Sequence, residues 1–369
     1  MNIDLFVSIG LYFSAIYALV LMTFMIGILV LPRKRDKEIK PISVIIAARN
    51  EEKHLPALLK AISNQDYPTN SFEVIIVDDR SIDSTWQILK KEINKYKWLH
   101  IYRIIDENPE LVGKKGALKL GITKTNCEIL AFTDADCLPG RNWLKEINAL
   151  MTDETDFLCG YSPLLVSGKL MNLLKNLERS SIFAVIAGSF GLGWDITSVA
   201  RSQVYRRSKF MKINGFAGIG KQRSGDDDLL LQKMSPVIRK RNFIFDPQAS
   251  VVSIDKPNLK EHIHLETRRA SKWKLYPLPI KLLTLFILIY YFIISWELIL
   301  AIFGEISWLI FIYLNLLKVL SEFTLLFIFL AKTGQLRQLL VFPIAELLYI
   351  PYYIYFGFRG TFGTYSWKK

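Results

Sequence analysis

The stretch Phe132-Thr133-Asp134-Ala135-Asp136-Cys137 follows the apolar run Ile129-Leu130-Ala131 and is closed by Pro139-Gly140. This pattern predicts a buried strand that ends in two carboxylates, one residue apart. Hard divalent ions such as Mg²⁺ and Mn²⁺ bind carboxylate oxygens together with substrate phosphates, so the pair is a candidate metal-diphosphate site. Asp is also common in the turns that end strands, because its side chain bonds the local backbone. The rest of the chain has to decide between these two interpretations.

The amino-terminal residues predict a membrane anchor. Residues 5–31 contain no charged side chain, and this length is enough for a bilayer core, which needs about 20 apolar residues. A secretory signal would have basic residues before a shorter apolar core, and the start Met-Asn-Ile-Asp has none. Basic residues follow instead: Arg33, Lys34, Arg35, Lys37 and Lys40. We therefore expect an anchor over residues 1–32, with everything after Pro32 in the cytoplasm.

The middle of the chain alternates short apolar runs with amphipathic segments. The predicted strands are residues 42–48, 72–77, 99–105 and 128–133, and the predicted helices are residues 51–64, 116–124 and 141–151, with a further helix that begins at Asp83. Alternation of this kind predicts an α/β domain with a Rossmann-like, mostly parallel sheet covered by helices. Ligands of such sheets bind outside the carboxyl ends of the strands.

Polar residues gather at those predicted strand ends. The first strand runs into Ala48-Arg49-Asn50-Glu51-Glu52, the second ends in Asp78-Asp79, and the fourth in Asp134-Ala135-Asp136. Two cations stand nearby in Gly113-Lys114-Lys115-Gly116. Carboxylates for a metal and for base and ribose hydroxyls, together with lysine for phosphate, indicate a nucleotide-diphosphate site.

Four blocks then resemble the family 2 glycosyltransferases with the GT-A fold. They are Val-Ile-Ile-Ala-Ala-Arg-Asn-Glu-Glu at 44–52, Val-Asp-Asp-Arg-Ser-Ile-Asp-Ser-Thr at 77–85, Gly-Lys-Lys-Gly-Ala-Leu at 113–118 and Thr-Asp-Ala-Asp at 133–136. The resemblance covers about residues 41–275, in the family's order. It implies a GT-A domain there, a UDP-sugar donor, and Mg²⁺ or Mn²⁺ as cofactor.

The resemblance also implies roles for single residues. Asp79, with Asp78, would contact the uracil and ribose, while Asp134 and Asp136 would face the ribose and the metal, Asp136 being the stronger metal ligand. The other implied nucleotide-sugar contacts are Ala48, Asn50, Glu51, Lys114 and Lys115. Simpler roles stay open: Asp83 and Glu51 as helix caps, and the two lysines as a solvated surface.

The acidic run Asp226-Asp227-Asp228 after Gly225 is similar to the family's acidic pair that precedes a helix. Neighbouring carboxylates raise one another's pKa, which suits a general base. The resemblance implies Asp226 or Asp227 as that base, with Asp226 favoured. An acidic helix amino terminus favoured by the helix dipole is the alternative. Upstream, Ala200-Arg201-Ser202 replaces the small step that the family carries before its acceptor helix.

Arg269-Ala-Ser-Lys272-Trp273 keeps the spacing of the family's Gln-x-x-Arg-Trp block, with Arg for Gln and Lys for Arg. The resemblance places Arg269, Lys272 and Trp273 against the diphosphate and acceptor, where cations would stabilise the charge of the leaving UDP. The same basic residues could instead mark the cytoplasmic edge of the next membrane segment. Nearby, His262 and His264 alternate on a predicted strand face, without the further Cys or His that a zinc site needs.

The carboxyl-terminal residues 278–369 predict a second membrane region. Residues 278–303 and 306–331 form an expected helical hairpin, in which Lys318 and Glu322 stand four apart and can pair. A third apolar stretch, residues 339–357, contains Pro343 and Pro351 and has basic residues on both sides, so we expect a re-entrant or interfacial segment. Residues 171–189 predict a helix that lies on the membrane surface or is buried.

These features together predict a multi-pass glycosyltransferase of the inner, cytoplasmic membrane that contacts membrane lipids and uses a lipid or glycan acceptor. The resemblance implies inversion at the anomeric carbon. A processive polysaccharide synthase and a non-catalytic nucleotide-sugar-binding scaffold are the alternatives. The net charge of +13 indicates a surface that meets anions. We expect no nucleic-acid partner, because the positive excess gathers beside the membrane segments.

Overall fold

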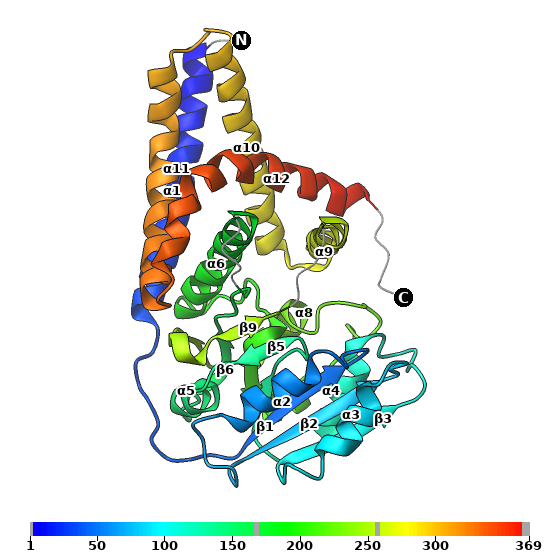
Figure 1. The fold of residues 1–369 in the computed structure, drawn as a ribbon. Coiled ribbons are helices and arrows are strands. Elements are labelled where there is room, and N and C mark those ends of the chain that lie inside the picture. The colour runs from blue at the N-terminus through cyan, green and yellow to red at the C-terminus, as the bar shows by residue number, and fades with distance from the viewer. Residues whose placement is uncertain (1–2, 166–169, 255–258, 364–369) are drawn as a thin grey trace.

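The computed structural model describes residues 3–165, 170–254 and 259–363. A bundle of long helices stands on an α/β domain, with a layer of helices between them (Figure 1). The strands are β1 Ile42–Ala48, β2 Phe72–Asp79, β3 Leu99–Ile104, β4 Ile129–Phe132, β5 Cys137–Pro139, β6 Thr155–Gly160, β7 Gln203–Arg206, β8 Lys240–Ile244 and β9 Val251–Ser253. The helices are α1 Ile3–Val30, α2 Leu55–Ser63, α3 Thr85–Glu92, α4 Lys114–Thr123, α5 Trp143–Leu150, α6 Leu170–Gly191, α7 Arg207–Lys212, α8 Asp228–Met234, α9 Leu259–Ser271, α10 Leu278–Ile302, α11 Trp308–Lys332 and α12 Phe342–Phe362.

The central sheet confirms the predicted mostly parallel arrangement. Its order is β3-β2-β1-β4-β7-β6-β8. Strands β3, β2, β1 and β4 run parallel, β7 is antiparallel to both β4 and β6, and β8 is parallel to β6. Because Ala48 pairs with Asp78 and Ile45 with Phe132, the carboxyl ends of β1, β2 and β4 share one edge of the sheet.

Each face of the sheet has its own hydrophobic core. One core joins alternate residues of β1 and β2 to α2, α3 and α5. The other joins the opposite sheet face to α4 and α6 and continues without a break into α1, α10 and α11. Side chains alternate between the faces of a strand, so an almost wholly apolar strand such as β1 feeds both cores. The α/β domain and the long helices therefore share one of the two cores.

Two predictions of local structure were wrong. The helix predicted from residue 51 begins at Leu55, because residues 50–54 form the loop beyond β1 and Pro56 is tolerated only in the first turn of a helix. His262 and His264 lie in α9, not in a strand. The segment 259–271 contains neither Gly nor Pro, and its good helix formers outweigh the short alternation at the two histidines.

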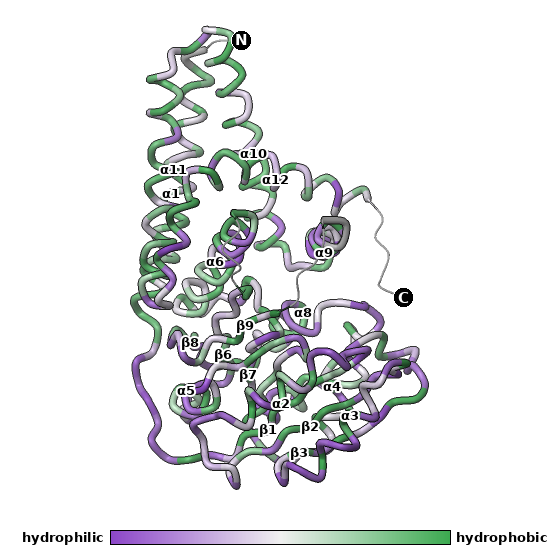
Figure 2. The backbone as a smooth tube through the Cα atoms, in the orientation of Figure 1, coloured by the Kyte–Doolittle hydropathy of each residue, from purple (hydrophilic) through white to green (hydrophobic). Residues whose placement is uncertain are grey.

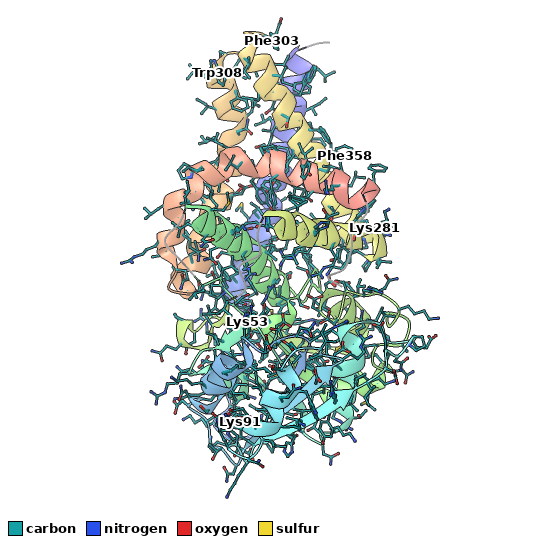
Figure 3. The ribbon with its side chains drawn as sticks, turned by 45° about the vertical axis from the view of Figure 1, so that its right-hand side comes forward. Lys53, Lys91, Lys281, Phe303, Trp308 and Phe358 are labelled. Atoms are coloured by element: carbon teal, nitrogen blue, oxygen red, sulfur yellow. The ribbon has the colours of Figure 1, made fainter. Side chains whose placement is uncertain are left out.

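Four helices in the described part of the chain are long and apolar enough to cross a membrane, by length and composition. They are α1, α10, α11 and the segment 336–362 that contains α12. Figure 2 shows that the bundle is mostly apolar along its length, whereas polar residues gather on the α/β domain. Phe303 and Trp308 mark the end of the bundle farthest from Lys53 and Lys91 of the α/β domain (Figure 3). Aromatic side chains in such a position suit a membrane-water interface.

Helix α12 runs across the axis of the other three membrane helices (Figure 1). It is one continuous helix in spite of Pro351, so the prolines of this segment do not break it.

The predicted pair of Lys318 and Glu322 is confirmed and is part of a larger buried network. The Lys318 ammonium lies 2.8 Å from Glu322 and 2.6 Å from Glu346 of α12. The Tyr17 hydroxyl of α1 donates to Glu322 at 2.5 Å. Ionisable groups at membrane depth are stable when they pair with one another, and this network joins α11 to both α1 and α12.

Helix α6 is buried over its carboxyl-terminal part, from Asn176 to Phe190. It packs against α1 at a point where glycines let the two backbones touch: a Cβ added to Gly188 would lie 2.6 Å from the carbonyl oxygen of Phe24, and Gly27 and Gly191 are equally confined by each other's helix. Small residues allow this close approach of helices. The contact holds α1 against the helix that covers the sheet.

Gly188→Ala should therefore destabilise the protein. The added methyl group has no space at the α1 backbone, and overpacking of this kind costs about 1–3 kcal/mol. Thermal unfolding of the purified protein in detergent would measure the loss. Gly357→Ala in α12 is the matched control, because its Cβ would meet only Leu288 at an ordinary 3.7 Å. Equal stability of the two variants would contradict the tight contact.

Candidate active site

The carboxylate pair that ends β4 lies at the shared strand edge, between two cations. Asp134 Oδ1 is 2.5 Å from the Lys114 ammonium at the start of α4. Asp134 Oδ2 is 3.8 Å from Arg201 Nε in the short 3₁₀ helix Ala200–Ser202. Both acidic side chains are half-buried. The two oxygens of Asp134 thus face cations from two different parts of the fold.

The residues present fit a hard divalent cation. Ligand atoms of Asp134, Asp136 and Cys137 all lie within 4.8 Å of one another. Two carboxylates suit Mg²⁺ or Mn²⁺, whereas the thiol is a soft ligand that these ions do not favour. Cys137 instead donates its S–H to Asp136 at 3.4 Å. The arrangement can hold a cation with Asp134 and Asp136 as ligands.

Lys114 connects the β4 pair to the second acidic cluster. Its ammonium also lies 3.4 Å from Asp226. Burial by itself would lower the pKa of Lys114, but the charges of Asp134 and Asp226 outweigh burial and raise it. Lys114 is therefore a charged group of the site and not part of a solvated surface.

Lys115 has a different use in this structure. Its fully buried ammonium donates to the carbonyl oxygens of Gln222 and Ser224, at 2.5 and 2.7 Å. Burial lowers the pKa of Lys115. The residue positions the loop that leads to Asp226, and its contact with a nucleotide stays a prediction.

The two carboxylates that end β2 differ in their surroundings. Asp78 is fully buried, lies 2.9 Å from Arg103 Nε and accepts a hydrogen bond from the Ser81 backbone N–H at 3.2 Å. Asp79 accepts from Arg80 Nε at 2.8 Å. Asp78 thus holds the turn after β2, and Asp79 is the one of the two that borders a cavity.

That cavity has a volume of about 300 Å³ and opens beside the start of α4. A planar base with several polar edges can use the mixed charges of its wall. The lining residues are Asp79, Arg80, Ile104, Glu107, Asn108, Leu111, Gly113, Gly116, Lys119 and Leu120. Arg80 pairs with both acidic residues of this lining, with Asp79 at 2.8 Å and with Glu107 at 3.1 Å.

The loop after β1 is tied to the loop after β2 by hydrogen bonds. Asn50 adopts a left-handed conformation, with φ of 57°, and its side-chain oxygen accepts from the Ile82 N–H at 2.9 Å. Glu51 faces His54 Nδ1 at 2.6 Å. Burial, and to a smaller extent the charges of Asp136 and Asp134, raise the pKa of Glu51 in spite of His54. Glu51 therefore interacts with the carboxylate pair. Ala48, the last residue of β1, is fully buried, and its contact with a nucleotide stays a prediction.

The alternative role of Asp83 is correct only in part, because the N-cap position of α3 is occupied by Ser84. The Asp83 carboxylate accepts from the backbone N–H of Thr85, the first residue of α3, at 3.0 Å, and from the N–H of Glu52 in the loop after β1 at 3.2 Å. Asp83 therefore ties that loop to the start of α3.

The three successive carboxylates separate in function. Asp226 faces Lys114, and Asp227 caps α8 by accepting from the Asp228 N–H at 2.8 Å. Although burial would raise it, the pKa of Asp227 is lowered by the charge of Lys272, 3.6 Å away. Asp228 pairs with Lys272 and accepts from the Tyr276 hydroxyl at 2.5 Å. Burial and the charge of Asp227 raise the pKa of Asp228 to about 6. The raised pKa that we expected for a general base in this acidic run therefore belongs to its third residue.

The block at the end of α9 contributes its members unequally. Lys272 reaches the acidic cluster, whereas Arg269 pairs with Glu266 of its own helix at 2.7 Å. The buried indole N–H of Trp273 has no hydrogen-bond partner among the residues described. Buried polar groups normally have partners, so a ligand atom can fill this place.

Sequence reasoning missed two contacts of the site. Tyr276 binds Asp228 from beyond the predicted block, and Arg201 binds Asp134 from a segment that the sequence analysis marked only as a departure from the family. The strand order supplies the reason: β7, which follows Arg201, pairs with β4, and no local pattern in the sequence predicts that antiparallel pairing.

Comparison with known proteins agrees with this fold. Residues 43–212 match the model of the family described as Glycosyl transferase family 2. Over these residues the chain resembles this family, and its fold is the GT-A fold. A mannosyltransferase from Pyrobaculum calidifontis, solved in complex with GDP-Man and Mn²⁺, has the same fold: the TM-score is 0.53 at 17% identity, covering 96% of this chain and 95% of that one.

Two curated relatives are similar over shorter stretches. The glycosyltransferase AglE of Haloferax volcanii is 36% identical over 28% of this chain. The beta-monoglucosyldiacylglycerol synthase of a Nostoc species is 35% identical over 33% of this chain. These matches span only 33% and 27% of the two relatives' own lengths.

The raised pKa of Asp228 predicts a pH-dependent stability. The folded protein binds this proton more tightly than the unfolded chain does, so the free energy of unfolding should fall as the pH rises from about 4 to about 6, by up to about 3 kcal/mol. Asp228→Asn should flatten this slope in denaturant unfolding at a series of pH values. Asp66→Asn is the control, because its exposed pair with Lys145 lowers the pKa of Asp66 and so keeps its titration below this window. Identical slopes for wild type and Asp228→Asn would contradict the assignment.

Proposed function

We propose that this chain is a membrane-bound glycosyltransferase that moves a sugar from a nucleotide-diphosphate sugar to a hydroxyl of a lipid or lipid-linked acceptor. The observation that carries the proposal is the meeting of Asp134, Asp136, Lys114 and Asp226 at one edge of a family 2 sheet. The name of the Nostoc relative, a glucosyldiacylglycerol synthase, supports a lipid acceptor.

The donor would lie along the carboxyl edge of β1, β2 and β4. Its base would enter the cavity beside Asp79, and its diphosphate would lie near Lys114 and the β4 carboxylates. Mg²⁺ or Mn²⁺ held by Asp134 and Asp136 would neutralise charge on the diphosphate. We propose UDP as the nucleotide, and since the Pyrobaculum protein was solved with GDP-Man, GDP-sugars belong in the same test.

Asp226 is the proposed general base. It shares the ammonium of Lys114 with Asp134, so it faces the donor side, whereas Asp227 is engaged as the cap of α8 and by Lys272. Asp226 would take the proton from the acceptor hydroxyl as that oxygen attacks the anomeric carbon, in a single displacement that inverts the configuration. Lys272 would stabilise the charge of the leaving nucleotide, with Trp273 beside it.

We further propose the cytoplasmic side of the cell membrane as the location of the α/β domain. The basic residues that follow α1 support this orientation, and α12 would lie at the interface in contact with lipids. The corresponding division is an anchor at 1–32, a catalytic domain at 41–275 and a carboxyl-terminal membrane region at 278–369.

Nucleotide release by the purified chain in detergent tests the function. The assay contains Mn²⁺, a panel of UDP- and GDP-sugars and a lipid extract, with Asp136→Asn and Asp226→Asn beside the wild type. We expect lipid-dependent release that falls at least about 100-fold in Asp226→Asn, the usual contribution of a general base, and that is also lost in Asp136→Asn. Asp66→Asn, which changes only an exposed ion pair with Lys145, should keep full activity.

Binding of a nucleotide without release under any acceptor would instead favour a non-catalytic scaffold. Release that both variants retain would remove the assigned roles of the two carboxylates while leaving the reaction class in place.

A further inference from the structure

Three arginines from separate elements lie close enough to interact, and one of them, Arg201, faces Asp134 of the carboxylate pair. Arg179 comes from α6, Arg201 from the 3₁₀ helix before β7, and Arg269 from α9. Arg179 interacts electrostatically with both of the others and with Cys137, the neighbour of Asp136. Like charges that are buried together destabilise one another unless an anion compensates them.

The carboxylates present compensate this cluster only in part. Arg269 has Glu266 at 2.7 Å and Arg201 has Asp134 at 3.8 Å. Arg179 donates to the backbone carbonyl of Ser162 at 3.2 Å, and in the described ranges it forms no ion pair with a carboxylate. Burial, followed by the charges of Arg201 and Arg269, lowers the pKa of Arg179 to about 9.

Two further groups point to a missing ligand. Glu178, the neighbour of Arg179, is a weak counter-charge, because burial and the charge of Glu266 raise the pKa of Glu178 to about 7. The fully buried hydroxyl of Ser162, whose carbonyl receives Arg179, has no hydrogen-bond partner among the described residues. An anion with several oxygens would supply both the charge and the hydrogen bonds that are lacking.

The cluster lies on the opposite side of Asp134 from the proposed nucleotide. Asp134 Oδ1 faces Lys114, whose neighbours Gly113 and Gly116 line the cavity, while Oδ2 faces Arg201. Helices α6 and α9 stand between the sheet and the membrane helices (Figure 1). A group that arrives from the bilayer would therefore pass α6 and α9, which carry Arg179 and Arg269, before it reaches the sheet.

We propose that Arg179, Arg201 and Arg269 bind a phosphate group of the acceptor lipid and so hold the acceptor beside the β4 carboxylates. Guanidinium forks match phosphate oxygens in geometry and charge. The inference rests on the proposed function, because it names the acceptor class of that site. The other source of the same chemistry is the phosphate of the donor, and the experiment separates the two.

The test measures binding without turnover. Full-length protein in a neutral detergent is titrated with a fluorescent short-chain phosphatidic acid and with diacylglycerol of the same chain length and label. The proteins are the wild type, Arg179→Gln, Arg179→Lys and Lys281→Gln, which removes one charge in the first turn of α10, far from Phe303 (Figure 3). UDP and GDP are titrated separately in the presence of Mn²⁺.

We expect the wild type to prefer phosphatidic acid over diacylglycerol, and Arg179→Gln to bind it about tenfold more weakly, as for the loss of a charged hydrogen bond. Arg179→Lys should recover part of the loss, since it keeps the charge without the planar fork. Lys281→Gln should match the wild type. Nucleotide affinity should be the same in all four proteins, and thermal unfolding should confirm that each is folded.

Equal binding of the two lipids by the wild type would overturn the proposal. An equal loss of nucleotide affinity in Arg179→Gln would assign the arginines to the donor phosphates instead. Phosphate-selective binding in a protein that releases no nucleotide would leave this site standing while the proposed reaction fails. Sugar transfer to a neutral lipid at a rate that is unchanged in Arg179→Gln would support the proposed reaction and overturn the phosphate site.

Discussion

The contact between α1 and α6 is the constraint on which the arrangement depends. Gly27, Gly188 and Gly191 allow the two backbones to touch, and the core of one sheet face continues through α6 into the membrane helices. The α/β domain is therefore packed against the bundle, and not only tethered to it by residues 31–41. Because α6 also carries Arg179, the same contact fixes the position of Arg179 relative to α1.

Ion pairs between lysines and carboxylates hold the side chains of the site in place, as the α1–α6 contact holds the helices. Each lysine of the site serves two acidic groups: Lys114 faces Asp134 and Asp226, and Lys272 faces Asp227 and Asp228. Such shared cations connect β4, α4, α8 and the end of α9, which are distant in sequence. The arginine side lacks this balance, and for that reason it is where an additional anion is proposed to bind.

The membrane region shows a further use of paired charges. Lys318 is nearly inaccessible and is held between Glu322 and Glu346, so α12 is joined to the bundle by an ion pair while it runs across the bundle axis (Figure 1). An apolar contact could slide along the helix, whereas buried charges are stable only in register. This pairing gives α12 a defined position above α9.

The sequence by itself determined the parallel strands, the membrane segments, the Lys318–Glu322 pair and the acidic strand ends, because strand periodicity, span length and helical spacing are local properties. It also placed Asp134, Asp136, Lys114 and Asp226 in one site through family motifs. Only the tertiary structure decided that Lys115 supports a loop, that the raised pKa belongs to Asp228, and that Arg201 faces Asp134. These results depend on burial and on pairings such as β4 with β7, which join residues too distant in the chain for any local pattern to connect.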